Sequence, residues 1–209
     1  SDNHKQSVLV TGASSGIGRA IAERLADDGF DVVVNYLRNE AGAAATLAAV
    51  RARGAEARSL QFDVADRAAA AEAVAKDIAA HGAYYGVVIN AGVVRDAAFP
   101  MLSGEDWDIV LRTDLDGFYN VLQPAIMPMI RRRQPGRIVC IASVADQEGV
   151  AVEHIVQDAG HDGVLIGSQG QQNGGGLQRM LDVGLARLSD LPLVGQFGEF
   201  VSFPHTLFV

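Results

Sequence analysis

The chain is predicted to adopt an α/β fold, in which a doubly wound, Rossmann-like parallel sheet carries helices on both faces. Three observations predict this fold. Short continuous apolar runs alternate with helical patterns, as expected of parallel strands that are buried on both faces. A glycine-rich turn at residues 11–18 links the first apolar run to the first helical pattern. The length of 209 residues suits one domain with a sizeable core.

The elements follow one another in a regular order. Strands are expected where valine, leucine and isoleucine cluster, over residues 7–10, 31–35, 57–64, 86–90 and 137–142. Helices are expected over residues 17–28, 41–53, 65–80 and 106–129. Gly29, Gly54 and Gly82 stop the first three helices. Pro124 and Pro128 should bend or interrupt the fourth helix.

The composition of the chain changes near residue 145. Residues 1–145 are predicted to form a dinucleotide-binding Rossmann-like domain, whereas residues 146–209 form an atypical tail, either part of the same domain or poorly packed. This C-terminal third lacks lysine, tyrosine and tryptophan, and its residues 167–176 have the composition of a linker. Apolar residues at helical spacing predict one helix over 177–188. The phenylalanine-rich end, 197–209, is either a strand or exposed apolar surface.

Composition also limits the function. A net charge of −8 argues against nucleic acid and anionic membranes as partners. No apolar run approaches the roughly 20 residues that span a bilayer, and the polar first residues do not resemble a signal peptide. Cys140 is the single cysteine, which suits a reducing compartment. We therefore predict a cytoplasmic protein, with no metal site.

The turn from Thr11 to Gly18 is predicted to bind phosphate groups. Its glycines let the backbone approach a pyrophosphate closely, and the following helix offers unpaired N–H groups and a positive dipole end. The residues predicted to bind the cofactor here are Gly12, Ser14, Ser15, Gly16, Ile17 and Gly18.

Further motifs follow the turn in a recognisable order. The TGxxxGxG turn, Asp63-Val64, Asn90-Ala91-Gly92, the segment Asp114 to Asn120 and Ser143 together resemble the short-chain dehydrogenase/reductase family over about residues 7–145. The nearest resemblance is to bacterial 3-oxoacyl-acyl-carrier-protein reductases. The resemblance does not extend to the tail.

The resemblance implies a role for each motif. Asp63, followed by Val64, would accept a hydrogen bond from the adenine amino group; the alternative, a helix cap, fits Asp66 better. Asn90, Ala91 and Gly92 would lie against the cofactor ribose, unless they form only a strand-end turn. Ser143 would bind the substrate carbonyl, and Asp114 stands where the family has a catalytic asparagine. An ionised aspartate only accepts hydrogen bonds, so this exchange would disturb a proton relay.

The end of the second strand predicts the choice of cofactor. Tyr36 stands where NAD-preferring relatives have an acidic residue, and Arg38 lies two residues further on. Arg38 would pair with the 2′-phosphate of NADP(H), or it is a solvated residue at the start of a helix. Ser15 stands where many NADP-using relatives have arginine or lysine. The predicted cofactor is NADP(H).

The family's proton donor, a tyrosine activated by a lysine one helical turn later, is not found. By spacing from Ser143 this pair should fall near Val156 and Gly160, but the last tyrosine is Tyr119 and the last lysine is Lys76. His154 or His161 is an alternative acid, because histidine titrates near neutrality. Surface histidines are the simpler interpretation.

Three hypotheses follow for the function. The chain is a working reductase with another acid, a nucleotide-binding protein without catalysis, or a reductase whose part after Ala145 results from a frameshift, rearrangement or engineered change. The abrupt loss of the pattern favours the third. The resemblance implies hydride transfer between NADP(H) and a ketone or secondary alcohol, impaired here, and a small-molecule or acyl-thioester substrate. It also implies a homodimer or homotetramer.

Overall fold

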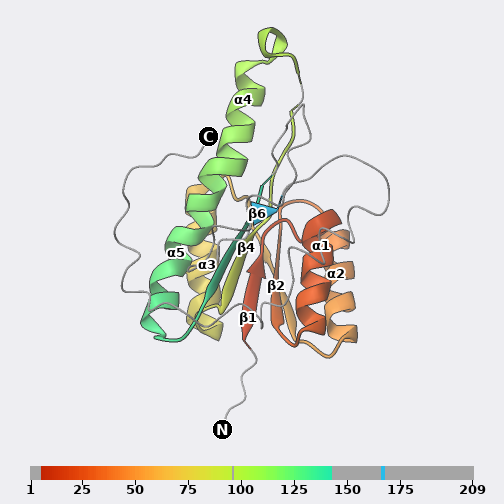
Figure 1. Ribbon diagram of the computed structural model, residues 1–209, viewed down its shortest axis with the longest axis vertical. Helices are drawn as coiled ribbons and strands as arrows, with labels where there is room; N and C mark the ends of the chain where they lie inside the picture. The colour runs from red at the N-terminus through yellow and green to blue at the C-terminus, as the bar shows by residue number, and fades with distance from the viewer. Residues whose placement is uncertain (1–5, 96, 143–165, 168–209) are drawn as a thin grey trace.

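A parallel sheet with the strand order β3-β2-β1-β4-β5-β6 forms the centre of the molecule (Figure 1). The computed structural model describes residues 6–95, 97–142 and 166–167. The strands are β1 (Ser7–Val10), β2 (Asp31–Tyr36), β3 (Ala57–Gln61), β4 (Gly86–Ile89), β5 (Arg137–Ile141) and β6 (Ile166–Gly167). Because β1 pairs with both β2 and β4, the order reverses beside β1, where open α/β sheets bind their ligands.

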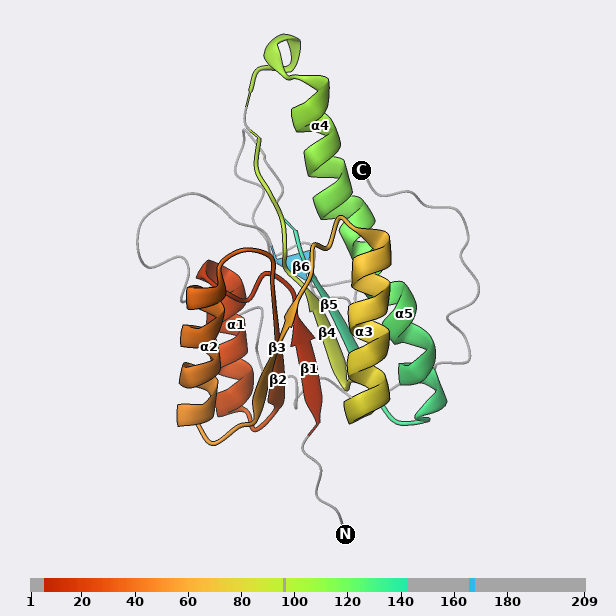
Figure 2. The same ribbon diagram turned by 180° about the vertical axis from the view of Figure 1, so that it is seen from behind.

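Helices cover both faces of the sheet, as predicted. Seen from the front and from behind, α1 (Gly16–Asp27) and α2 (Glu40–Ala52) lie on one face, and α3 (Arg67–His81) and α5 (Gly117–Arg131) on the other (Figures 1 and 2). Each face has its own apolar core. Val34 of β2 packs with Leu25 and Val50 in one core, whereas Leu9 of β1 packs with Met129 in the other.

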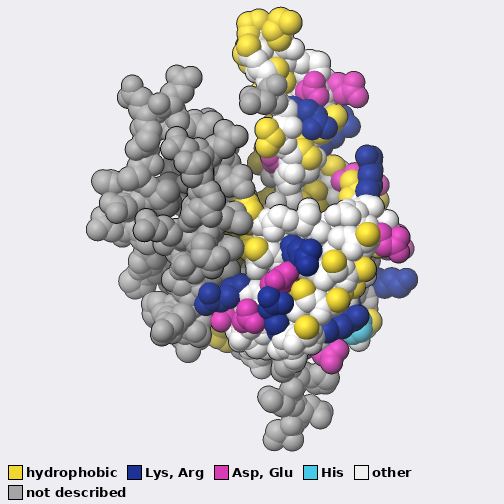
Figure 3. Space-filling view, turned by 90° about the vertical axis from the view of Figure 1, so that its right-hand side faces the viewer, with side chains coloured by type: hydrophobic (Ala, Val, Ile, Leu, Met, Phe, Trp, Pro, Cys, Tyr) yellow, Lys and Arg dark blue, Asp and Glu magenta, His cyan; other side chains and the backbone are white. Residues whose placement is uncertain are grey.

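A projection rises beyond the carboxyl edge of the sheet (Figure 1). We call it the arm and define it as residues 93–95 and 97–116. It contains the short 3-10 helix η1 (Phe99–Met101), α4 (Gly104–Val110) and the π-helical segment η2 (Leu111–Asp116), which leads directly into α5. Hydrophobic side chains gather at its tip (Figure 3), where Phe99 and Met101 are about 80% exposed.

Two expected element boundaries are wrong, for local reasons. The strand expected over 57–64 ends at Gln61, because the Asp63 carboxylate accepts a hydrogen bond from Ala65 N (2.9 Å) and turns the chain. The next helix begins at Arg67 rather than residue 65. Asp66 caps it by accepting hydrogen bonds from Ala68 N and Ala69 N, both 3.0 Å.

The fourth helical region also differs from its expectation. It runs from Gly104 to Arg131, and Pro124 and Pro128 lie inside α5 without interrupting it. The departure from α-helix lies instead at η2, before either proline. Ser103 caps the start, with its hydroxyl accepting a hydrogen bond from Asp106 N (3.0 Å).

Strand β6 was not expected from the sequence. It pairs with β5 through Cys140 and Ile166. The expectations for residues 177–188 and 197–209, and the boundary near 145, lie outside the described residues. Within the described part of the chain, no helix has the length and apolar character to cross a membrane.

Candidate nucleotide-binding site

The glycine turn between β1 and α1 depends on left-handed backbone at two positions. Gly12 has φ +64° and Gly16 has φ +53°, a region that favours glycine. A Cβ added to Gly12 would lie 3.0 Å from the Cα of Ala91, whereas one added to Gly16 would meet no atom within 4 Å. The turn is therefore tightly packed beneath Gly12 and open at Gly16, where α1 begins.

Gly18 lets α1 pack directly on the turn. A Cβ at this position would lie 2.5 Å from both Asn90 Nδ2 and the carbonyl oxygen of Gly12, so any side chain would displace the helix. Ser15 is the N-cap of α1, but its hydroxyl makes no capping hydrogen bond. Within the described residues no group accepts a hydrogen bond from the N–H of Gly16, Ile17 or Gly18. These open donors suit an anion.

Thr11 joins the glycine turn to the turn after β4. Its buried hydroxyl oxygen accepts hydrogen bonds from Asn90 N (2.8 Å) and Ala91 N (2.9 Å) and contacts the Val88 carbonyl oxygen (3.3 Å). In return, Asn90 Nδ2 donates to the Thr11 carbonyl oxygen (2.9 Å). Asn90, Ala91 and the glycine turn are thus brought together by Thr11, which was not among the predicted site residues.

Asn35 fixes the other side of the turn, and sequence reasoning missed it. This side chain is 2% exposed. Its Oδ1 accepts a hydrogen bond from Gly12 N (3.1 Å), and its Nδ2 donates to the carbonyl oxygens of Leu60 (3.3 Å) and Phe62 (3.1 Å). The available signal was an amide inside the apolar run of β2, since a buried amide must find partners.

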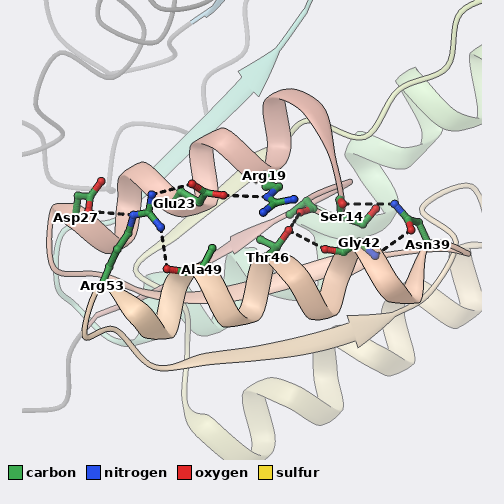
Figure 4. Close-up of polar contacts among 10 residues, drawn as sticks. Ser14, Arg19, Glu23, Asp27, Asn39, Gly42, Thr46, Ala49 and Arg53 are labelled. Carbon is green, nitrogen blue, oxygen red and sulfur yellow. Dashed lines mark hydrogen bonds and ion pairs between the residues drawn. The ribbon is translucent and has the colours of Figure 1, made fainter.

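Helix α2 supports the turn from outside (Figure 4). Thr46 Oγ1 donates a hydrogen bond to the Ala13 carbonyl oxygen (2.9 Å), and Asn39 Nδ2 donates one to the Ser14 carbonyl oxygen (3.4 Å). Gly42 leaves no room for a Cβ, which would overlap the Ser14 carbonyl. The α2 backbone therefore lies against Ser14.

Along the same two helices runs a chain of ion pairs, which links Arg19, Glu23, Arg53 and Asp27 (Figure 4). These pairs belong to the mixed basic and acidic surface of α1 and α2 (Figure 3). These partly exposed pairs join α1 to the end of α2 and contribute little each, whereas the buried Thr46 hydroxyl joins α2 to the turn itself.

Asp63 and Val64 lie in the turn after β3, not in the strand. Asp63 is half-buried, and its Oδ1 is engaged by Ala65 N. No group in the described residues occupies its Oδ2, which leaves an acceptor for a ligand. Val64 is 6% exposed, and its carbonyl oxygen accepts a hydrogen bond from Asn120 Nδ2 (2.9 Å). Asp66 takes the capping role, as expected.

The residues that bear on cofactor choice lie at the end of β2. Tyr36 is buried in the core, so its ring is structural. Arg38 follows on the exposed surface, and its guanidinium has no ion-pair partner among the described residues. Ser15 is also exposed. Arg38 is therefore a cation available to an anionic group.

Asp114 contacts the turn after β4. It lies in η2, is exposed, and its Oδ1 accepts a hydrogen bond from Val93 N (2.9 Å). A Cβ at Gly92 would lie 3.4 Å from the same oxygen. Ser143, His154 and the positions where the tyrosine and lysine are expected lie outside the described residues. The described site therefore contains the nucleotide half, with Asp114 at its border.

A reversing parallel sheet with a glycine turn at the start of its first helix defines a Rossmann-type protein. The family described as short chain dehydrogenase matches residues 6–155. The chain belongs to this family, and it resembles the 3-oxoacyl-acyl-carrier-protein reductases within it.

Two reductases are similar to the chain over most of its length. The chain is 54% identical over 168 residues to 3-oxoacyl-[acyl-carrier-protein] reductase FabG of Aggregatibacter actinomycetemcomitans, an alignment that covers 80% of this chain and 62% of that protein. It is 36% identical over 144 residues to the reductase of the same name from Staphylococcus aureus strain Mu50, covering 69% and 58%. The chain thus spans less than two thirds of the length of these relatives. The 168-residue alignment runs beyond Ala145.

Solved structures show the same fold. A gluconate 5-dehydrogenase from Burkholderia cenocepacia J2315, in complex with NADP and tartrate, superposes with a TM-score of 0.62 at 36% identity and covers 68% of this chain and 56% of that one. A putative short-chain alcohol dehydrogenase from Sinorhizobium meliloti 1021 gives 0.63 at 32% identity, with 69% and 57% coverage.

Proposed function

We propose that the chain binds NADP(H) and serves hydride transfer between this cofactor and a ketone or secondary alcohol, as in the 3-oxoacyl-acyl-carrier-protein reductases. The observation that carries the proposal is the open start of α1, where a Cβ at Gly16 would meet no atom within 4 Å and three N–H groups lack acceptors among the residues that the structure describes. When bound, NADP(H) supplies the hydride. The residues of the chain orient and bind the cofactor.

Each part of the cofactor has a suitable partner. The turn around Gly16 would hold the pyrophosphate through backbone N–H groups. The unpaired Oδ2 of Asp63 would accept the adenine amino group, and Arg38 would pair with the 2′-phosphate. A carboxylate would repel that phosphate, and Tyr36 is uncharged and buried. The NADP in the Burkholderia structure supports the same choice.

The chain is proposed to turn over weakly. Hydride transfer to a ketone builds negative charge on its oxygen, which must be protonated or stabilised as it forms. A general acid typically contributes about 10²–10⁴-fold, and the sequence holds no tyrosine after Tyr119. Asp114 is an acceptor already bonded to Val93 N.

We further propose that the substrate is a small carbonyl compound or an acyl thioester, and that the protein acts in the cytoplasm as a homo-oligomer.

Arg38→Ala tests the cofactor proposal. NADPH and NADH are titrated against the purified chain by nicotinamide fluorescence. We expect NADPH to bind about tenfold to a hundredfold more tightly, since a charge-assisted contact contributes roughly 1.5–3 kcal/mol. Arg38→Ala should abolish this preference. Arg131→Ala, which removes an equally exposed charge at the far end of α5, should keep it. Equal affinities in the native chain would contradict the assignment.

The same preparations test turnover. NADPH oxidation with a short 3-oxoacyl thioester should be near the blank rate in the native chain and unchanged in Ser143→Ala. Rapid oxidation that depends on Ser143 would show that another acid is present, and His154 would be the next residue to replace.

A further inference from the structure

One stretch of helix touches both turns that flank the proposed nucleotide site. Asp114 in η2 accepts a hydrogen bond from Val93 N after β4 (2.9 Å), and Asn120 in α5 donates to the Val64 carbonyl oxygen after β3 (2.9 Å). Between them, a Cβ at Gly117 would lie 3.1 Å from Val64 Cγ2. The start of α5 is therefore packed directly against the turn that carries Asp63.

The Asn120 amide is buried, and both its ends are used. The side chain is 2% exposed. Its Nδ2 satisfies Val64, and its Oδ1 accepts a hydrogen bond from Arg67 Nε (3.0 Å). The Arg67 guanidinium also lies over the Tyr119 ring, 5.1 Å from the centroid. Because Arg67 is the first residue of α3, these contacts hold the turn after β3 at its middle, through the Val64 carbonyl, and at its end, through Arg67.

Building on the proposed function, we infer that Asn120 is a positioning residue for the adenosine half of the cofactor. It touches the Val64 carbonyl and Arg67, which enclose the three-residue turn that follows Asp63. A buried carbonyl without a donor is costly, so without Asn120 the turn would shift toward solvent. The Asp63 carboxylate would then no longer lie where it can accept a hydrogen bond from the adenine amino group. The effect is indirect, through the backbone.

Asn120→Asp is the sharpest variant. It keeps the size of the side chain and an acceptor for Arg67, but it places an oxygen against the Val64 carbonyl. Arg67→Met removes only the guanidinium from an exposed residue. This variant should therefore fold even if Asn120→Asp does not. We expect Asn120→Asp to weaken binding of adenosine 2′,5′-bisphosphate about tenfold, the size expected for a lost buried hydrogen bond. Arg67→Met should weaken it less.

Tyr84→Phe is the matched control. Tyr84 is fully buried and donates a hydrogen bond to Asp77 Oδ2 (2.8 Å) just before β4, at the opposite edge of the sheet from the site. The variant also removes one buried hydrogen bond, here from a phenol to a carboxylate. Binding of adenosine 2′,5′-bisphosphate and of NADPH is measured by titration calorimetry on the full chain, and thermal unfolding is measured for each variant.

The outcomes separate the claims. If the native chain binds neither ligand, the proposed function fails. If the native chain binds both, and Asn120→Asp and Arg67→Met bind the bisphosphate as tightly, the inference about Asn120 is overturned. Equal loss of affinity in Tyr84→Phe at an equal loss of Tm would also overturn it, because Asn120 would then be only a general stabilising residue.

Asp114→Ala removes the contact to the turn after β4. It should weaken the binding of NADPH more than the binding of the bisphosphate.

Discussion

Single buried polar side chains hold the glycine turn in place. Asn35 joins the turn to the end of β3, Thr11 joins it to the turn after β4, and Thr46 joins it to α2. Each is almost fully buried and each has its partners within the protein, as buried polar groups require. The backbone that would face the cofactor is therefore fixed from behind, while its front remains open.

Asn35→Leu should lower the free energy of unfolding by roughly 3 kcal/mol, because it removes the side-chain partner of Gly12 N and of the Leu60 and Phe62 carbonyl oxygens, the last of which is buried. Urea unfolding measures the change. Asn39→Leu is the control, since Asn39 is an exposed N-cap of α2 whose loss should cost about 1 kcal/mol. Equal losses in the two variants would show that the buried amide has no special importance.

At the scale of elements, the helices differ in how they end. Gly29, Gly54 and Gly82 follow α1, α2 and α3 with positive φ. After α5 the corresponding left-handed residue is Arg133, with φ +54°. Its N–H donates to the Ile130 carbonyl oxygen (3.0 Å). An arginine in this conformation is strained, because its Cβ crowds the backbone.

Arg133→Gly should raise the free energy of unfolding by about 1 kcal/mol, because glycine adopts this conformation without strain. Thermal or urea unfolding measures the gain. Arg131→Gly places glycine inside the last turn of α5 and should instead lower stability, by up to about 1 kcal/mol. A loss of stability in both variants would mean that the Arg133 side chain contributes more than its backbone strain costs.

The molecule as a whole presents an apolar surface on η2 and α5. Leu115 is 65% exposed, Tyr119 53% and Met127 48%. Phe118 and Ile130 are also exposed, each at 37%. One side of α5 packs on the core, through residues such as Val121 and Met129. A helix that is apolar beyond its core face favours association, in agreement with the proposed homo-oligomer.

Sedimentation velocity should therefore show a dimer or tetramer for the native chain. The double variant Leu115→Ser, Met127→Ser should shift it toward monomer, because it removes apolar contacts from this surface. Leu37→Ser, at an exposed site just after β2, should leave the association unchanged. A native chain that sediments as a monomer would contradict the proposal.

The core of the fold could be predicted because its signals are local. Runs such as Val32 to Val34 and glycines such as Gly29 determine strands and helix ends by themselves. The turn from Phe62 to Asp66 could not be placed, because two aspartates three residues apart, Asp63 and Asp66, can each end a strand or cap a helix. Strand β6 is only two residues long and pairs at a distance in the chain, so it gives no periodic signal.

The sequence motifs name the glycines and strand ends of the candidate site but not the residues that support them. Gly12, Gly18 and Asn90 meet as their motifs imply. Asn35 and Asn120 become important only through partners that lie far away in the chain, and no spacing shows such pairs. Pro124 and Pro128 were expected to bend or interrupt the helix, but they do not interrupt α5, because a helix packed on a sheet tolerates the missing hydrogen bonds.

The π-helical segment η2 places the arm and α5 in different rotational phase. A π turn holds about one residue more than an α turn, and each α-helical residue turns the chain by about 100°. Losing a single residue between Leu111 and Asp116 would therefore rotate the arm about its own axis while Asn120 stayed seated on Val64. Changes in chain length here, rather than substitutions, would re-aim the hydrophobic tip of the arm and would also displace Asp114 from the turn after β4, while leaving the contacts of Asn120 in place.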